Sequence, residues 1–152
     1  MIHIDHGGDL RATKSFFDKC REHGVAFDVI GQSYYPWWHG TSDDLRKNMA
    51  FMANEYQKDI VLVEVAYNWR PAEYRNRTAP FPETPEGQRA FLDEVNQIVL
   101  DTPNKRGRGI FWWEPAVHPS PIASRGMFDQ SGKALPVINV FDKQAGTKAL
   151  SD

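Results

Sequence analysis

Residues 59–67 read DIVLVEVAY, an apolar run that carries one carboxylate, Glu64, near its end. A continuously apolar segment of this length is typical of a strand covered on both faces, as in a parallel sheet with crossover helices. A charged side chain at the end of such a strand is costly unless it has partners. Glu64 is therefore the first candidate for a functional residue.

Three further strand candidates flank this segment: MIHID at residues 1–5, AFDVIG at 26–31 and GIFWWEPA at 109–116. They alternate with helical patterns, which predicts a parallel sheet and an α/β fold. A (β/α)8 barrel needs eight strands and about 250 residues, whereas this chain has 152 residues. We therefore expect half of a TIM barrel, folded as a single partial domain over residues 1–152.

Three amphipathic helices are predicted between the strands. The first follows a cap at Asp9 and ends at His23-Gly24, the second runs over residues 43–56, and the third opens at Thr84-Pro85. The second is expected to be capped by Thr41 or Ser42, and the third to stop before Pro103. The residues expected to be buried are Leu10, Phe16, Phe17 and Cys20 in the first helix, Leu45, Met49, Met52 and Tyr56 in the second, and Phe91, Leu92, Val95, Ile98 and Val99 in the third. A last apolar stretch, LPVINVF at residues 135–141, predicts a closing helix or a packed tail.

The composition excludes several classes of function. With 41% hydrophobic residues and a formal net charge of -2, the chain is typical of a soluble domain. The short basic run at residues 105–108 does not predict a nucleic-acid partner, and the single Cys20 excludes an intrachain disulfide. There is neither a run of about 18 apolar residues nor a signal-peptide pattern, so we expect no membrane partner and, as written, a cytoplasmic chain.

No metal or cofactor is predicted. His3, Asp5 and His6 lie close together in the sequence, but on a strand His3 and Asp5 share one face and His6 points to the other. No cysteine or second histidine pair completes a zinc site.

The candidate site follows from the topology. In a parallel sheet with crossover helices, the loops that follow the strands gather on one face, and in barrels that face holds the chemistry. Aromatic and polar side chains concentrate there, and they include Asp5, Ser33, Tyr34, Tyr35, His39, Glu64 and Trp113.

These segments also carry a family resemblance. FDVIGQSYYPWWHGTSDDL at residues 27–45, VLVEVAY at 61–67, TPEGQRAFL at 84–92 and GIFWWEPA at 109–116 resemble the arabinogalactan endo-1,4-β-galactosidases of glycoside hydrolase family 53. The resemblance implies that the four strands are the fifth to eighth of a (β/α)8 barrel, so that the first half of the barrel is absent from this chain. It implies a retaining endo-hydrolase of β-1,4-galactan and a family whose members are usually secreted.

The resemblance assigns Glu64 as the catalytic nucleophile. A retaining glycosidase uses a second carboxylate, about 5–5.5 Å away, as acid and base. In the family that residue follows an Asn at the end of the fourth strand, and the one Asn-Glu pair here, Asn54-Glu55, falls inside the second predicted helix. The acid/base residue is therefore expected to be missing from this chain.

Other roles are implied in the same way. Tyr34 or Tyr35 is expected to hydrogen-bond the nucleophile, and strand alternation allows only one of them to point inward. Trp113 is expected to form the floor of the subsite for the attacked sugar, because a galactose face can stack on an indole. The candidate hydroxyl partners are Asp5, Ser33 and His39.

Two alternatives remain open from the sequence. The chain could be an inactive half-barrel that binds sugar or self-assembles, or it could derive from another retaining β-glycanase, such as a glucanase or mannanase. An open sheet with two unpaired edges predicts a homodimer or a missing N-terminal half as partner.

Overall fold

The structure is a computed structural model that describes residues 1–71, 79–116 and 123–142. The described chain divides into two compact units. The sheet unit comprises residues 1–65 and 95–113, and the loop unit comprises the described residues of 66–94 and 114–152. The expectation of one domain over residues 1–152 stays a prediction.

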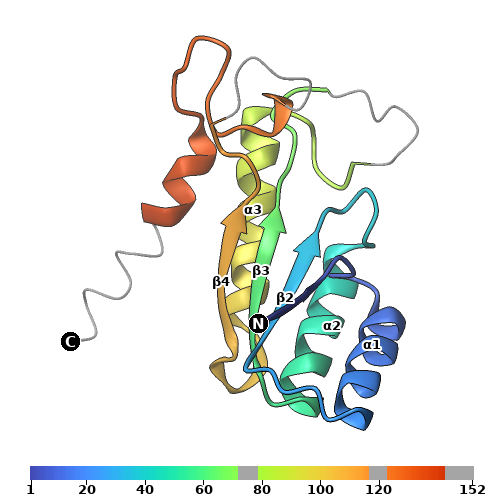
Figure 1. Cartoon of the computed structure of the whole chain (residues 1–152). Helices are drawn as coiled ribbons and strands as arrows, with labels where there is room; N and C mark the ends of the chain where they lie inside the picture. The colour runs from blue at the N-terminus through green and yellow to red at the C-terminus, as the bar shows by residue number, and fades with distance from the viewer. Residues whose placement is uncertain (72–78, 117–122, 143–152) are drawn as a thin grey trace, which may run out of the picture. The chain divides into compact units, whose positions relative to one another are not determined.

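The sheet unit contains four parallel strands in the order in which they occur along the chain (Figure 1). They are β1 (Ile2–Ile4), β2 (Val29–Tyr34), β3 (Asp59–Val65) and β4 (Gly107–Trp112). Each strand pairs with its neighbour in sequence, as in a (β/α)8 barrel. The predicted parallel α/β sheet is confirmed.

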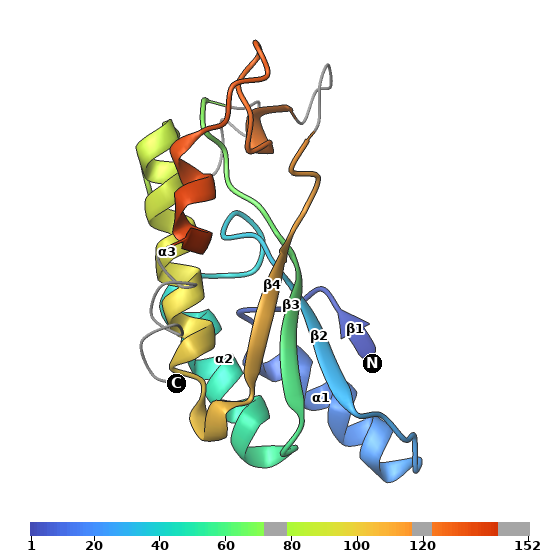
Figure 2. The same ribbon diagram turned by 90° about the vertical axis from the view of Figure 1, so that its left-hand side faces the viewer.

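Helices cover one face of this sheet (Figure 2). They are α1 (Leu10–Glu22), α2 (Ser42–Glu55) and the part of α3 (Pro85–Leu100) that belongs to the sheet unit, from Val95 onward. A short 3-10 helix, η1 (Pro103–Lys105), leads into β4. None of the described elements of the sheet unit covers the opposite face of the sheet, which we call the open face.

The core of the sheet unit lies between the helices and the sheet. Ile60, Leu62 and Val65 of β3 are buried there, and so are all residues of the predicted α2 stripe. The start of β4 approaches the end of α3 so closely that a Cβ atom at Gly107 would lie 2.0 Å from the carbonyl oxygen of Val99. Glycine is required at this contact.

Two residues of α1 that were predicted to be buried are exposed. The helix turns Thr13, Phe17 and Cys20 toward the core, whereas Leu10 and Phe16 lie on its outer side. The prediction for Leu10 and Phe16 was wrong because α1 is the first helix of the sheet unit, and no described element of that unit lies beyond it.

The second strand also differs from its prediction. It was expected to end at Gly31 but continues to Tyr34. The polar residues of this extension have partners. The amide of Gln32 donates to the hydroxyl of Thr13 at 3.2 Å, and the hydroxyl of Ser33 lies 2.7 Å from Nε2 of His3. Because these groups are satisfied, the strand can remain buried past the end of its apolar run.

The N-terminus of α2 carries a capping box. The hydroxyl of Thr41 accepts from the backbone N–H of Asp44 at 3.2 Å, and the Asp44 carboxylate accepts from the backbone N–H of Thr41 at 2.9 Å. The backbone N–H and the hydroxyl of Thr41 both donate to the Asp44 carboxylate, and these two hydrogen bonds lower the pKa of Asp44 below its usual value. The stabilisation is therefore present above the unfolded pKa and is lost as the pH falls through the folded one.

We expect Thr41→Ala to lower the free energy of unfolding by about 1 kcal/mol at pH 7, because the substitution removes the N-cap hydroxyl. The difference from the wild type should shrink as the pH falls below the pKa of an unfolded aspartate, about 3.9, and on through the lower folded pKa of Asp44. Urea unfolding of both proteins at pH 7 and at pH 3.5 measures it. Ser42→Ala, one position into the helix, is the control, and an equal loss in both variants would contradict the assignment of Thr41 as the cap.

The loop unit is organised around the N-terminal part of α3. Tyr67 stacks on Phe91 with ring centroids 4.6 Å apart, and its hydroxyl donates to the carbonyl oxygen of Phe81 at 2.5 Å. Burial raises the pKa of Tyr67 to about 12. The buried amide of Gln88 donates to the carbonyl oxygens of Tyr67 and Gly126, both at 2.9 Å. The segment after β3 is thereby joined to the turn at η2 (Ala123–Arg125).

The predicted closing helix is confirmed. The 3-10 helix η3 (Pro136–Ile138) continues as helix through residue 142, the last residue described. Val137 and Val140 are buried. No helix in the described part of the chain is long and apolar enough to cross a membrane.

Candidate active site

Alternation along β2 decides which side chains reach the open face. Gln32 contacts Thr13 of α1 and Met52 of α2, so it points toward the helices. Its neighbour Ser33 therefore points to the open face, where its hydroxyl meets His3. Tyr35, two residues further, follows Ser33 onto that face.

An irregularity in β3 brings Glu64 to the same face. Gln32 pairs with Leu62, but the next residue, Ser33, pairs with Glu64 rather than with Val63. The pairing with β4 shows the same extra residue, because Leu62 pairs with Ile110 and Val65 with Trp112. Strict alternation from Leu62 would turn Glu64 toward the helices; the bulge turns it to the open face instead.

The hydroxyl of Tyr35 donates to Oε2 of Glu64 at 3.2 Å. Of the two tyrosines left open by the sequence, Tyr35 is thus the one that reaches Glu64. Tyr34 is fully buried, and its hydroxyl donates to the carbonyl oxygen of Gly40 at 3.2 Å. Glu64 itself is partly exposed, as a group that acts on a ligand must be.

His39 supports Tyr35 from the loop after β2. Its Nδ1 accepts from the backbone N–H of Tyr35 at 3.1 Å, and the two rings lie 5.8 Å apart. An accepting Nδ1 requires the tautomer with the proton on Nε2. Burial lowers the pKa of His39, against the opposing effects of nearby Asp5 and Glu64. Histidine is therefore expected to be neutral here at pH 7.

We expect the NMR titration of the His39 ring to give a pKa below 6.5 and an unprotonated Nδ1 at neutral pH. Because the folded pKa is lowered, the unfolded state binds the proton first, and stability falls as the pH drops below about 6.5. Denaturant unfolding between pH 7.5 and 5.5 measures the second effect. In His39→Gln, which keeps an acceptor, this pH-dependent component should disappear; if it persists unchanged, His39 does not cause it.

A pair of glycines holds the loop after β1 against the site. The backbone N–H of Gly7 donates to the carbonyl oxygen of Ser33 at 3.0 Å, and a Cβ atom at Gly8 would lie 1.8 Å from the carbonyl oxygen of His39. The buried amide of Asn48 secures the same loop by donating to the carbonyl oxygen of Gly7 at 2.8 Å. The loops after β1 and β2 are thus in direct contact.

The other candidates lie at the ends of β1 and β4. Trp113 is exposed, and its backbone N–H donates to the carbonyl oxygen of Val65 at 2.8 Å, next to Glu64. Asp5 is exposed, with an oxygen 3.7 Å from Nε2 of His6. Asp5, Ser33, Glu64 and Trp113 thus come from the ends of four adjacent strands. Their roles toward a substrate stay predictions.

Among the described residues there is no cluster of three or more His, Cys, Asp and Glu side chains that could hold a metal ion. The basic run at residues 105–108 is partly neutralised, since Arg106 and Arg108 lie 3.4 and 3.2 Å from oxygens of Asp59.

Sequence reasoning missed three polar residues that build the site. His3 was considered only as a metal ligand, but it is the partner of Ser33. Gln32 and Asn48 are fully buried and connect the sheet to the helices and to the loop after β1. A polar residue inside an apolar pattern was the available signal, because such residues are retained only with hydrogen-bond partners.

Comparison with known proteins identifies the family of this chain. The model of glycosyl hydrolase family 53 matches residues 1–141. The chain belongs to this family. The arabinogalactan endo-beta-1,4-galactanase of Thermothelomyces thermophilus is 34% identical over 161 residues, an alignment that covers 94% of this chain and 47% of the relative. A Niallia circulans protein, described as an uncharacterized protein in the bgaB 5' region, is 39% identical over 89% of this chain and 42% of its own length.

A solved family 53 catalytic domain from Ignisphaera aggregans has the same fold. It superposes with a TM-score of 0.82 at 28% identity, over 92% of this chain and 45% of that domain. The family 53 chain described here thus spans about half the length of the relatives that it matches, and it corresponds to their C-terminal half. The predicted half of a TIM barrel is confirmed.

Proposed function

We propose that this chain supplies the nucleophile half of a retaining endo-β-1,4-galactanase active site, with Glu64 as the nucleophile. The observation that carries the proposal is the contact between the Tyr35 hydroxyl and Glu64 on the open face. A tyrosine hydroxyl that donates a hydrogen bond to a carboxylate can orient it toward a substrate. Family membership and the galactanase name of the 34% identical relative support galactan as the substrate.

In this mechanism Glu64 attacks the anomeric carbon from one face of the sugar while a second carboxylate protonates the departing oxygen. Trp113, at the end of the neighbouring strand, offers its indole to the apolar face of the sugar ring. Hydrolysis of the resulting ester then requires a base that activates water, which is the same second carboxylate in retaining enzymes. This second residue is proposed to lie outside this chain.

The proposal is tested in a complete barrel. The N-terminal part of the Thermothelomyces galactanase, which this chain does not match, is fused in front of residue 1. We expect hydrolysis of β-1,4-galactan with retention of configuration at the anomeric carbon. NMR spectra of the freshly formed products measure that configuration. The isolated chain should be slower by a factor on the order of 10² to 10⁴, the usual contribution of general acid catalysis. Inversion, or activity confined to β-glucan or mannan, would reject the galactanase assignment.

A further inference from the structure

His39 holds both backbone groups of Tyr35. Tyr35 lies one position beyond β2, where the ladder between β2 and β3 ends. Its backbone N–H donates to Nδ1 of His39 at 3.1 Å, and its carbonyl oxygen accepts from the backbone N–H of His39 at 2.9 Å. The backbone N–H of Trp38 donates to the same carbonyl oxygen at 3.0 Å. The position of Tyr35 therefore depends on the turn that ends at His39.

This turn is packed on both sides. A Cβ atom at Gly8 would overlap the carbonyl oxygen of His39, so the loop after β1 lies directly against it. The His39 ring packs against the rings of Tyr35 and Trp38, with centroids 5.8 and 6.5 Å away. Only 6% of Tyr35 is exposed, and a closely packed side chain moves together with its backbone. The Tyr35 hydroxyl that donates to Glu64 is thus positioned from the other end of the residue.

A single proton reverses the role of Nδ1. A neutral imidazole has one acceptor nitrogen, whereas in the imidazolium both nitrogens are donors. A protonated Nδ1 of His39 would direct its N–H at the backbone N–H of Tyr35, so the hydrogen bond between them would be lost. Because a buried N–H that loses its acceptor is costly, the turn and Tyr35 would have to move apart.

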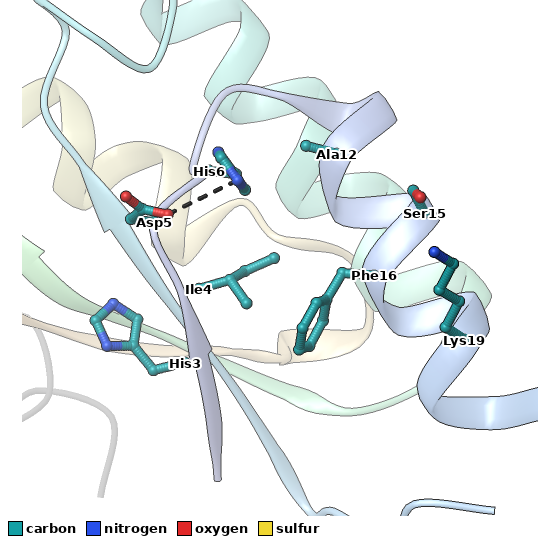
Figure 3. A pocket seen from close by; sticks show the side chains of 8 residues that line it. All are labelled: His3, Ile4, Asp5, His6, Ala12, Ser15, Phe16 and Lys19. Carbon is teal, nitrogen blue, oxygen red and sulfur yellow. Dashed lines mark ion pairs between the residues drawn. The ribbon is translucent and has the colours of Figure 1, made fainter. Parts of the chain in front are cut away.

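The charged groups around His39 determine when this proton binds. Figure 3 shows Asp5 and His6 side by side at the end of β1, with an oxygen of Asp5 3.7 Å from Nε2 of His6. Glu64 faces His39 from β3, and from α2 the carboxylate of Asp44 borders the same turn. Burial lowers the pKa of His39; Asp5 and Glu64 oppose this effect. The charge of His6 adds to it, and the proton therefore binds below about pH 6.5.

We propose that His39 is a positioning residue for the reaction at Glu64. Neutral His39 holds Tyr35, and the Tyr35 hydroxyl in turn holds the carboxylate of Glu64 in the orientation for attack. Protonated His39 releases both. The inference rests on the proposed function, because it names a residue that regulates the same nucleophile. His39 takes no part in the covalent steps, and it passes no proton to the substrate.

The coupling is tested first without any reaction. NMR follows three signals of the 152-residue chain between pH 7.5 and 5: the His39 ring, the Tyr35 backbone N–H and the carboxyl carbon of Glu64. We expect one shared midpoint. In His39→Asn, whose side-chain oxygen takes the place of Nδ1 and does not titrate, the Tyr35 signal should lose this midpoint. The wild-type titration needs no variant, so a Tyr35 N–H that does not follow His39 overturns the proposal by itself.

Tyr35→Phe separates the proposed path from the direct effect of the His39 charge on Glu64. The variant keeps the backbone N–H and removes only the hydroxyl. His39 should titrate as in the wild type, whereas the Glu64 signal should lose at least half of its response at that midpoint. A response of full size would mean that the charge acts through space, and it would overturn the proposal. Circular dichroism shows whether each variant folds.

The role in the reaction is tested in the complete barrel with β-1,4-galactan. The kcat of the wild type should fall on the acid side at the His39 midpoint. His39→Leu, which removes the acceptor at every pH, should lower kcat by a factor on the order of 10 to 10², with a smaller change in KM. His39→Asn should recover most of this loss at pH 7.5 and lack the fall at the His39 midpoint.

His23→Asn is the matched control, because it is the same substitution at an exposed histidine at the end of α1. It should keep the wild-type pH profile. An acid limb that is unchanged in His39→Asn overturns the proposed role. A shared midpoint in the chain, together with a complete barrel that does not hydrolyse galactan, supports the coupling and rejects the proposed function instead.

Discussion

Glu64→Gln is expected to abolish galactan hydrolysis in the complete barrel, with a loss in kcat on the order of 10⁴-fold or more, in the range seen when a covalent nucleophile is removed. The amide is nearly the same size as the carboxylate but cannot attack the anomeric carbon. Substrate affinity should change little, because the Tyr35 hydroxyl can still donate to the amide oxygen of the new side chain.

Initial rates on β-1,4-galactan and calorimetric binding of a galacto-oligosaccharide measure the two effects. Glu55→Gln is the matched control: it is the same substitution at an exposed position of α2, where Glu55 pairs with Arg21 at 2.9 Å. Surface ion pairs of this kind contribute little to stability. Turnover that survives Glu64→Gln at the wild-type rate would mean that another group is the nucleophile.

Gly8→Ala is expected to destabilise the isolated chain strongly. The new Cβ atom would lie 1.8 Å from the carbonyl oxygen of His39 and 3.3 Å from the Cβ atom of Asp44. The first of these is backbone, so the loops after β1 and β2 must separate to admit the methyl group. Overpacking of this kind costs about 1–3 kcal/mol, and the separation should also disturb the hydrogen bond between Tyr35 and His39.

Urea unfolding measures the cost, and the NMR signals of the His39 ring report the local change. Gly126→Ala is the control, because the nearest atom to its added Cβ would lie 3.4 Å away, an ordinary contact distance. A loss no larger than in the control would show that the two loops are not held together as tightly as the coordinates place them.

The alternation of apolar runs and helical stripes was sufficient to predict the parallel sheet. The periodicity of α2 places Leu45, Met49 and Met52 in the core, because a helix between the sheet and solvent has only one face to bury. The sequence narrowed the cap of α2 to Thr41 or Ser42, because both side chains can accept from a backbone N–H of the first turn, and the structure selects Thr41.

Three features could not be read from the sequence alone. The exposure of Phe16 depends on what lies beyond α1 and not on the α1 sequence. The extension of β2 through Gln32 depends on Thr13, nineteen residues earlier in the chain. The choice between Tyr34 and Tyr35 requires the position of the strand relative to its helices, and a one-residue error in that register reverses the answer.

The extra residue in β3 limits how this site could be transplanted. Ile60, Leu62 and Glu64 are spaced two apart, so in a regular strand the acid would join the aliphatic side chains that contact the helices. An engineer who grafts only the acid and its tyrosine onto another parallel scaffold would therefore bury the acid. The local backbone irregularity has to be copied together with the two side chains.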